Sequence, residues 1–214
     1  MADLLKVTAK LRSPRGCPWD RQQNHRSLRF HAVEEVYELM DAIENGDDQE
    51  LSEELGDLLF LVVFHCQLAR ERGAFDFERV ARRITSKLVR RHPHVFGNVK
   101  VKDVQEVWAN WEKIKSAEKR GTRQARSSAL DGIPKHLPAL MRAEKLFKKA
   151  RRANLLVAAP SNQSRLGRKA LARQLFKLAR QAHAHGWSAE DLLRGEIARH
   201  ERALRRREKR ARAA

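Results

Sequence analysis

The sequence is poor in the residues that interrupt helices, and it has little cysteine. Its 214 residues include 10 glycines, 6 prolines and 2 cysteines, whereas 34% are charged and 42% are hydrophobic. Few helix breakers beside many charges favour long helices with solvated faces over sheets. The two cysteines, Cys17 and Cys66, cannot form a disulfide framework and have no zinc-site spacing, so we expect the reducing environment of the cytoplasm.

The sequence also lacks a long hydrophobic run. The longest, residues 58–69, contains His65 and Gln67 and is much shorter than the ~20 residues that span a bilayer. The first ten residues have no apolar signal core. We therefore expect a soluble, cytoplasmic protein without a membrane partner, in which residues 58–69 form a buried helix.

Acidic residues are scarce in the second half of the chain. Residues 1–120 have 21 Lys and Arg against 20 Asp and Glu, whereas residues 121–214 have 24 against 7. Nearly the whole net charge of +18 therefore lies in the second half. The neutral first half argues against nucleic-acid binding there, and the second half is able to attract a polyanion.

Hydrophobic residues recur at helical spacing along most of the chain. In the first long helix, Val33, Val36, Met40 and Ile43 predict a buried stripe. Helices are expected over residues 27–44, 49–71, 75–91, 104–119, 137–153, 166–185 and 189–212, with loops at 13–18 and 157–164. The expected fold class is all-α, with a four-helix bundle in residues 1–120, a linker over 121–136 and a second helical region in 137–214.

Five acidic residues lie on the first two of these helices. Residues 35 and 38 share one helix face, and so do residues 54 and 57, because a spacing of three residues is nearly one helical turn. The five acids are Glu34, Glu35, Glu38, Glu54 and Asp57. The face of residues 54 and 57 continues into Leu61, Phe64 and Leu68, which are expected to face the core. The pattern therefore predicts two carboxylates on a buried apolar stripe.

Unpaired carboxylates on a buried stripe are costly, and neighbouring ones repel each other. The sequence has no Lys or Arg between Arg29 and Arg70 to neutralise them. A bound dication solves the problem, and a set of oxygen ligands without cysteine suits Mg²⁺ or Mn²⁺ better than zinc. The alternative is that these acids are ordinary solvated charges on helix surfaces.

Five sequence motifs of this chain resemble segments of the MazG-type pyrophosphohydrolases, and they follow one another along the chain in the order of that family. E-E-V-Y-E at 34–38 followed by E-L-G-D at 54–57 resembles the E-E-x-x-E…E-x-x-D signature of that family. C-P-W-D at 17–20, G-D-L-L-F at 56–60, R-R-H-P-H-V-F at 90–96 and W-E-x-x-K at 111–115 are similar to other MazG segments. One such string is weak evidence, but the full series, covering about residues 8–120, is specific.

The resemblance implies hydrolysis of a nucleoside triphosphate to a monophosphate and pyrophosphate. It also implies a MazG-like helical bundle and a Mg²⁺ site, with Mn²⁺ as a possible substitute. The ligands that it implies are Glu35, Glu38, Glu54 and Asp57. Glu34 is then the remaining carboxylate of the catalytic set, and either acts as a base toward water or lies behind the metal ligands.

A triphosphate also requires cations and a surface for its base. Candidates on the third and fourth helices lie one turn apart, where arginine can bind phosphate oxygens in a bidentate manner. The candidate substrate-binding residues are Lys87, Arg90, Arg91, Trp111, Lys115 and Trp19. For each cation the alternative is a solvated basic face. Trp19 either stacks on the base or anchors the core or a lid. His92 and His94 flank Pro93, where a role in capping the loop is favoured over phosphate contact.

The second half resembles a degenerate second MazG-like region. In the alignment of A-L-A-R-Q-L-F (170–176) with residues 54–60, Ala170 takes the place of Glu54 and Arg173 the place of Asp57. Arginine cannot bind a dication, because the guanidinium has no free lone pair. We therefore expect no metal site there.

Three functions are compatible with the sequence. The first is a pyrophosphohydrolase acting in nucleotide house-cleaning or regulation. The second is a basic helical protein that binds nucleic acid or another polyanion and has an inactive MazG-like half. The third is a helical interaction protein whose acids are relics. The intact set of five acids favours the first, and an exposed face on so small a bundle favours a homodimer. The pattern does not specify the preferred base.

Overall fold

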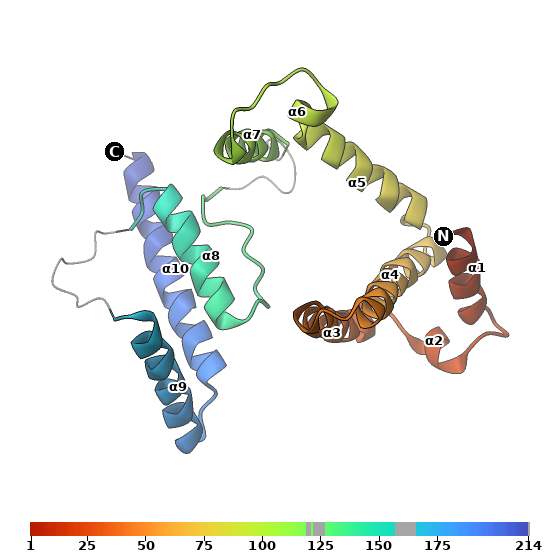
Figure 1. Cartoon of the computed structure of the whole chain (residues 1–214), viewed down its shortest axis with the longest axis horizontal. Coiled ribbons are helices and arrows are strands. Elements are labelled where there is room, and N and C mark those ends of the chain that lie inside the picture. The colour runs from red at the N-terminus through yellow and green to blue at the C-terminus, as the bar shows by residue number, and fades with distance from the viewer. Residues whose placement is uncertain (119–120, 122–126, 157–165, 214) are drawn as a thin grey trace. The chain divides into compact units, whose positions relative to one another are not determined.

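The structure is a computed structural model, which describes residues 1–118, 121, 127–156 and 166–213. Every regular element in these ranges is a helix and none is a strand, which confirms the all-α class (Figure 1). The predicted loop at 157–164 and residues 122–126 of the predicted linker lie outside the described residues. None of the described helices has the length and apolar character required to cross a membrane.

The chain forms two compact units, Met1–Ile114 and Lys115–Ala214. The first contains α1 (Ala2–Leu11), α2 (Pro18–Gln22), a 3-10 turn (Ser27–Arg29), α3 (His31–Asn45), α4 (Asp48–Glu71), α5 (Phe77–Arg91), α6 (Pro93–Phe96) and most of α7 (Val104–Ala117). The second contains α8 (Ala139–Arg152), α9 (Arg168–Ala184) and α10 (Ala189–Ala213). The predicted helices agree with these bounds within a few residues, except that the segment expected at 27–44 begins with a separate 3-10 turn.

Helices α3 and α4 form a tight hairpin, which is the central feature of the first unit. Gly46 ends α3 with φ of 71°, in the left-handed region that glycine adopts without strain. The side chain of Asp47 then caps α4 by accepting hydrogen bonds from the backbone N–H groups of Gln49 (2.9 Å) and Glu50 (3.1 Å). Two residues thus turn the chain back on itself and place the acids of α3 beside those of α4.

The core beneath this hairpin consists of Leu28, Leu61, Phe64 and Leu68, all buried as the sequence predicted for the three residues of α4. Helix α1 also packs against α4. The predicted buried stripe of α3 is wrong: Val33, Val36, Met40 and Ile43 are 43–58% exposed. Helix α3 instead meets α4 through the face of residues 32, 35, 39 and 42, and the small side chain of Ala42 is fully buried.

The second unit has a core of its own between α8 and α10, which lie side by side (Figure 1). Its buried residues are Leu130, Ala139, Leu146, Ala150, Leu155, Ile197 and Leu204. Leu130 lies in the segment predicted to be a linker, so the described residues 127–136 pack against this unit. Glu208 of α10 holds that segment by accepting hydrogen bonds from the Ser128 hydroxyl and from the backbone N–H of Ala129 (2.7 Å).

Candidate metal centre

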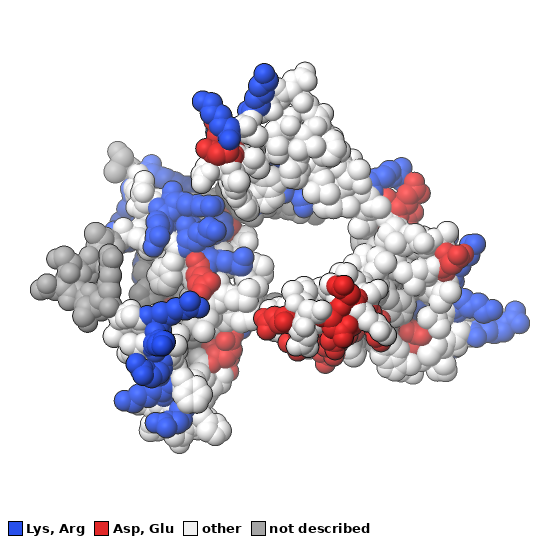
Figure 2. Space-filling model, in the orientation of Figure 1, with Lys and Arg blue, Asp and Glu red and all other residues white. Residues whose placement is uncertain are grey.

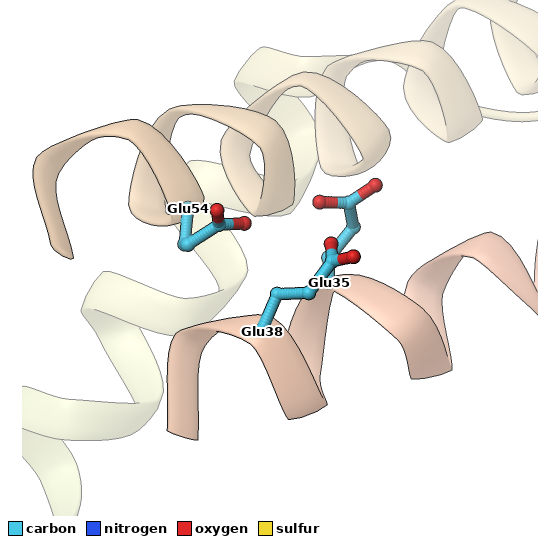
Figure 3. A group of neighbouring side chains, drawn as sticks. All are labelled: Glu35, Glu38 and Glu54. Carbon is cyan, nitrogen blue, oxygen red and sulfur yellow. The ribbon is translucent and has the colours of Figure 1, made fainter. Parts of the chain in front are cut away.

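Three carboxylates from the two helices of the hairpin converge on one point. Glu35 and Glu38 lie one turn apart on α3, and Glu54 faces them from α4 (Figure 3). One oxygen of each lies within 4.8 Å of one oxygen of the other two. The i,i+3 spacing within α3 and the short hairpin turn together produce this arrangement.

Asp57 lies one turn after Glu54 and belongs to the same electrostatic group. Among charged neighbours it has the largest effect on Glu35, whose pKa it raises, and it also raises the pKa of Glu54. The structure therefore brings together three of the four residues that the resemblance implies as metal ligands, and the fourth, Asp57, acts on them electrostatically.

Charge repulsion in this cluster is not relieved by any described cation. Partial desolvation is the largest cause of the raised pKa of Glu35 and of Glu54, and every charged group that adds to either shift is another carboxylate. This agrees with the absence of Lys and Arg between Arg29 and Arg70 in the sequence. The site consequently attracts positive charge. Figure 2 shows acidic side chains gathered over the α3–α4 hairpin.

The prediction that these acids lie on a buried stripe is wrong in one respect. Leu61 and Phe64 are buried, but Glu54 is only half-buried and Asp57 is exposed. The core covers α4 from Leu61 onward, whereas the first half of α4 is covered on one side by α3. The carboxylates thus lie on a part of the hairpin that solvent reaches.

The residues present fit a hard dication. The donors are carboxylate oxygens, which Mg²⁺ prefers, and the open side leaves room for water and phosphate oxygens. The oxygens of the three carboxylates lie within 4.8 Å of one another, so rotations of flexible glutamate side chains can bring them around one ion.

Glu34 is not among the three converging carboxylates. Its Oε2 lies 3.0 Å from Nδ1 of His31 at the start of α3. Glu34 is still among the carboxylates that raise the pKa of Glu35, so it lies at the edge of the same site. His31 was missed by the sequence reasoning, because a single histidine one turn before an acid is a common pattern.

The candidate phosphate-binding cations lie on other helices. Lys87, Arg90 and Arg91 are at the end of α5, and α5 begins beside the C-terminal half of α4, away from the acids. Arg91 is buried, and its guanidinium lies over the ring of Trp111 at 5.0 Å from the centroid. This contact joins α5 to α7, which carries Lys115. Nδ1 of His92 donates to the carbonyl of Leu88 (2.7 Å) and caps α5, as the capping interpretation expects.

Trp19 lies on α2 with 52% of its surface exposed, which rules out a core anchor. Its ring meets the edge of His31, with centroids 6.0 Å apart. Trp19 is therefore connected to the acidic site through His31 and Glu34.

The geometry agrees with comparisons to known proteins. Residues 23–96 match the family model described as the MazG nucleotide pyrophosphohydrolase domain, and this segment contains all five acids. The chain is 48% identical over 147 residues to a nucleoside triphosphate pyrophosphohydrolase of Escherichia coli (strain K12). The chain belongs to the MazG family. It is also 46% identical over 148 residues to the nucleoside triphosphate pyrophosphohydrolase/pyrophosphatase MazG of Thermotoga maritima.

These matches cover different shares of the proteins. The match to the E. coli protein covers 68% of this chain and 55% of that protein. The match to the T. maritima MazG covers 69% of this chain and 55% of that protein. The chain therefore spans about half the length of these relatives. An uncharacterised 26.1 kDa protein of Streptomyces cacaoi is 38% identical over 91% of this chain and 76% of its own length. The crystal structure of a MazG-related protein from T. maritima aligns with a TM-score of 0.46 and 26% identity, over 54% of this chain and 98% of that one.

We predict that Glu38→Gln and Asp57→Asn each remove most of the stabilisation by Mg²⁺. Wild-type protein should melt at a higher temperature as Mg²⁺ is added, because a ligand that binds only the folded state stabilises it. Each substitution deletes an anionic ligand and hardly changes the side-chain volume. A thermal melt monitored by circular dichroism, with and without Mg²⁺, measures the shift.

The matched control is Glu44→Gln, which removes an exposed carboxylate of α3 that lies outside the cluster. It should keep the full shift. The metal assignment is wrong if Glu38→Gln and Asp57→Asn keep it as well.

Proposed function

We propose that this MazG protein hydrolyses nucleoside triphosphates to a nucleoside monophosphate and pyrophosphate with Mg²⁺. The observation that supports this most strongly is the convergence of carboxylates from α3 and α4, in a part of the sequence that has no Lys or Arg between Arg29 and Arg70. The similarity of 68% of this chain to a nucleoside triphosphate pyrophosphohydrolase of E. coli points to the same reaction.

In this proposal Glu35, Glu38, Glu54 and Asp57 would hold Mg²⁺, with Mn²⁺ as a substitute. The ion would supply charge neutralisation at the phosphates and would activate the attacking water. Glu34, outside the ligand set, would either act as a base toward that water or lie behind the metal ligands, and its contact with His31 would orient it. Lys87, Arg90 and Lys115 would bind the outer phosphates, and Arg91 would act together with Trp111, on which it lies. Trp19 would contact the base.

The reaction has a definite product pattern. With Mg²⁺ and any accepted nucleoside triphosphate, phosphorus NMR should show monophosphate and pyrophosphate appearing together. Glu38→Gln should lower turnover by about a hundredfold or more, since such sites depend on electrostatic stabilisation. Glu44→Gln should be unaffected. Diphosphate and orthophosphate as the primary products would refute this function.

We infer that the partner of the exposed α3 face is a second copy of this chain. Four hydrophobic side chains, Val33, Val36, Met40 and Ile43, form a continuous exposed stripe at helical spacing, larger than isolated surface residues account for. Two α3–α4 hairpins that bury this stripe against each other form a four-helix arrangement with twofold symmetry. The acids at 35 and 38 lie off this stripe, so the pairing does not bury them.

Val36→Glu should convert the dimer to a monomer, because it places two charges in the apolar interface. Sedimentation velocity gives the mass of both proteins. Val7→Glu, at an exposed apolar position of α1, is the matched control and should leave the dimer intact. A wild-type monomer at micromolar concentration contradicts the inference.

We also propose that α9 contacts polyanions. Lys169, Arg173, Lys177 and Arg180 lie on one face of α9 at spacings of three and four residues, and all are exposed. None has an ion-pair partner within the described parts of the chain, whereas Arg194, Arg199, Arg205 and Arg212 of α10 are paired. Figure 2 shows basic side chains over α9 and α10. This stripe favours nucleic-acid or polyphosphate binding as the second candidate function.

A triple variant in which glutamine replaces Lys169, Arg173 and Lys177 should bind a single-stranded oligonucleotide more weakly than the wild type. The slope of log affinity against log salt should fall by about two, because each lost phosphate contact removes ~0.7 from it. Fluorescence anisotropy at several salt concentrations measures this slope. The control variant replaces Lys6, Lys10 and Arg15 of the first unit with glutamine. Its net charge changes by the same amount, and it should bind the oligonucleotide nearly as well as the wild type. Equal loss in both variants would show that only net charge matters. A cytoplasmic location stays a prediction.

A further inference from the structure

Residues 17–30 connect α1 to α3 across one end of α4, and we call this segment the strap. It includes α2 with Trp19 and the 3-10 turn before α3. Two separate sets of side-chain contacts attach the strap to α4. The first involves Arg12, just before the strap, and the second involves His25 within it.

Arg12 joins three parts of the first unit. Its Nε and Nη2 donate to the two carboxylate oxygens of Glu71 on α4, at 2.7 and 2.6 Å. Its Nη1 donates to the backbone carbonyls of Asp20 and Gln23, the latter at 3.2 Å. The guanidinium also lies over the ring of Phe64, 5.5 Å from the centroid. Arg12 is thus bonded to α4 and to both ends of the turn after Trp19.

This geometry requires arginine. Its side chain is 10% exposed, so its hydrogen bonds are formed largely away from water. The hydrogen bonds between Arg12 and Glu71 raise the pKa of Arg12 and lower the pKa of Glu71, so each side chain stabilises the charge of the other. A planar fork with five donors can serve a carboxylate and two carbonyls together, whereas the ammonium of lysine cannot reach both sets.

The second attachment is a pair of stacked histidines. Nδ1 of His25 lies 2.9 Å from Nδ1 of His65 on α4, and the rings are 11° from parallel. Arg72 donates to Nε2 of His25 at 3.1 Å. Because arginine only donates, Nε2 accepts, so Nδ1 of His25 carries the proton and donates to His65. The strap is therefore fixed at a second point, near its middle.

The strap places Trp19 beside the carboxylate site. Trp19 meets His31 edge-on, His31 contacts Glu34, and Glu34 is among the groups that raise the pKa of Glu35. A half-exposed indole at the edge of a charged site offers a flat apolar surface that water covers poorly. A nucleobase is a flat group that stacks on such a surface and is attached to the phosphates that the carboxylate site requires.

We propose that Arg12 is a positioning residue for nucleotide binding: by clamping Asp20 and Gln23 to Glu71, it holds Trp19 and His31 as the wall against which the nucleoside lies. This rests on the proposed function. Recognition is then divided between two parts of the site. The metal centre and the cations bind the triphosphate, and the strap binds the base and ribose. Inorganic tripolyphosphate, which has no nucleoside, makes no use of the strap.

Steady-state kinetics of Arg12→Lys, Trp19→Ala and the double variant test the proposal in the full-length protein. Trp19→Ala should raise KM for a nucleoside triphosphate about fivefold or more, the range of one lost base–aromatic stack, with kcat changed about twofold at most. Arg12→Lys should raise KM in the same direction. The double variant should be no worse than Trp19→Ala, since both changes act through one contact. The inhibition constant of tripolyphosphate should be unchanged in all three.

Arg82→Lys, at an exposed ion pair with Glu78, is the matched control and should behave as wild type. Glu71→Gln opens the clamp from the other side and replaces Arg12→Lys if that variant does not fold, as judged by circular dichroism. The role of Arg12 is overturned if the increases in KM of the two single variants multiply in the double variant. It is also overturned if Arg12→Lys weakens the binding of nucleotide and of tripolyphosphate equally. If the Trp19→Ala enzyme is active and its KM is unchanged, Trp19 does not contact the nucleoside, and that part of the proposal is overturned. Absence of turnover in the wild type overturns the proposed function instead.

Discussion

Repulsion among carboxylates is the constraint on which the rest of the first unit depends. Glu35, Glu38 and Glu54 have oxygens within 4.8 Å of one another, and all the charged groups that shift the pKa of Glu35 are acids. Like charges at such separations oppose folding unless other contacts hold them. The hairpin turn at Gly46 and Asp47 and the buried side chains of Ala42 and Phe64 provide those contacts. The hairpin thus keeps a site ready for a dication.

The sequence predicted the helices and the acidic group well, because both depend on local spacing. Residues three apart on one helix share a face whatever the rest of the chain does, and Gly46 with its neighbouring acids ends one helix and starts the next. The buried stripe of α3 was wrong for a related reason. Periodicity shows that Val36 and Met40 share a face, but it does not show which element covers that face.

Contacts between distant residues were beyond the sequence reasoning. Arg12 and Glu71 are separated by 59 positions, and His25 and His65 by 40. No local pattern marks either pair, because an arginine after a first helix and an acid near the end of another are ordinary surface residues. Only the packing of α1 against α4 brings them together. The partial burial of Glu35 and Glu54 and the exposure of Asp57 also depend on packing, since the core under α4 begins only at Leu61.

The two units use charge in opposite ways. In the first, acids are concentrated without cations on the α3–α4 hairpin. In the second, Glu201 pairs with Arg142 of α8 and with Arg205, and Glu208 holds the segment before α8 against α10. In the predicted alignment of the two halves, Ala170 and Arg173 of α9 take the places of Glu54 and Asp57, so we expect chemistry from the first unit alone. The second unit retains a helical core and an unpaired basic stripe.

The central claim is that the α3–α4 carboxylates hold the dication used in the reaction. The most direct measurement is anomalous diffraction from crystals grown with Mn²⁺ and a non-hydrolysable nucleoside triphosphate analogue. We predict a peak between α3 and α4, about 2.0–2.2 Å from carboxylate oxygens of Glu35, Glu38, Glu54 and Asp57. A peak that lies elsewhere while the analogue is bound, or bound analogue without a peak at this hairpin, would contradict the claim.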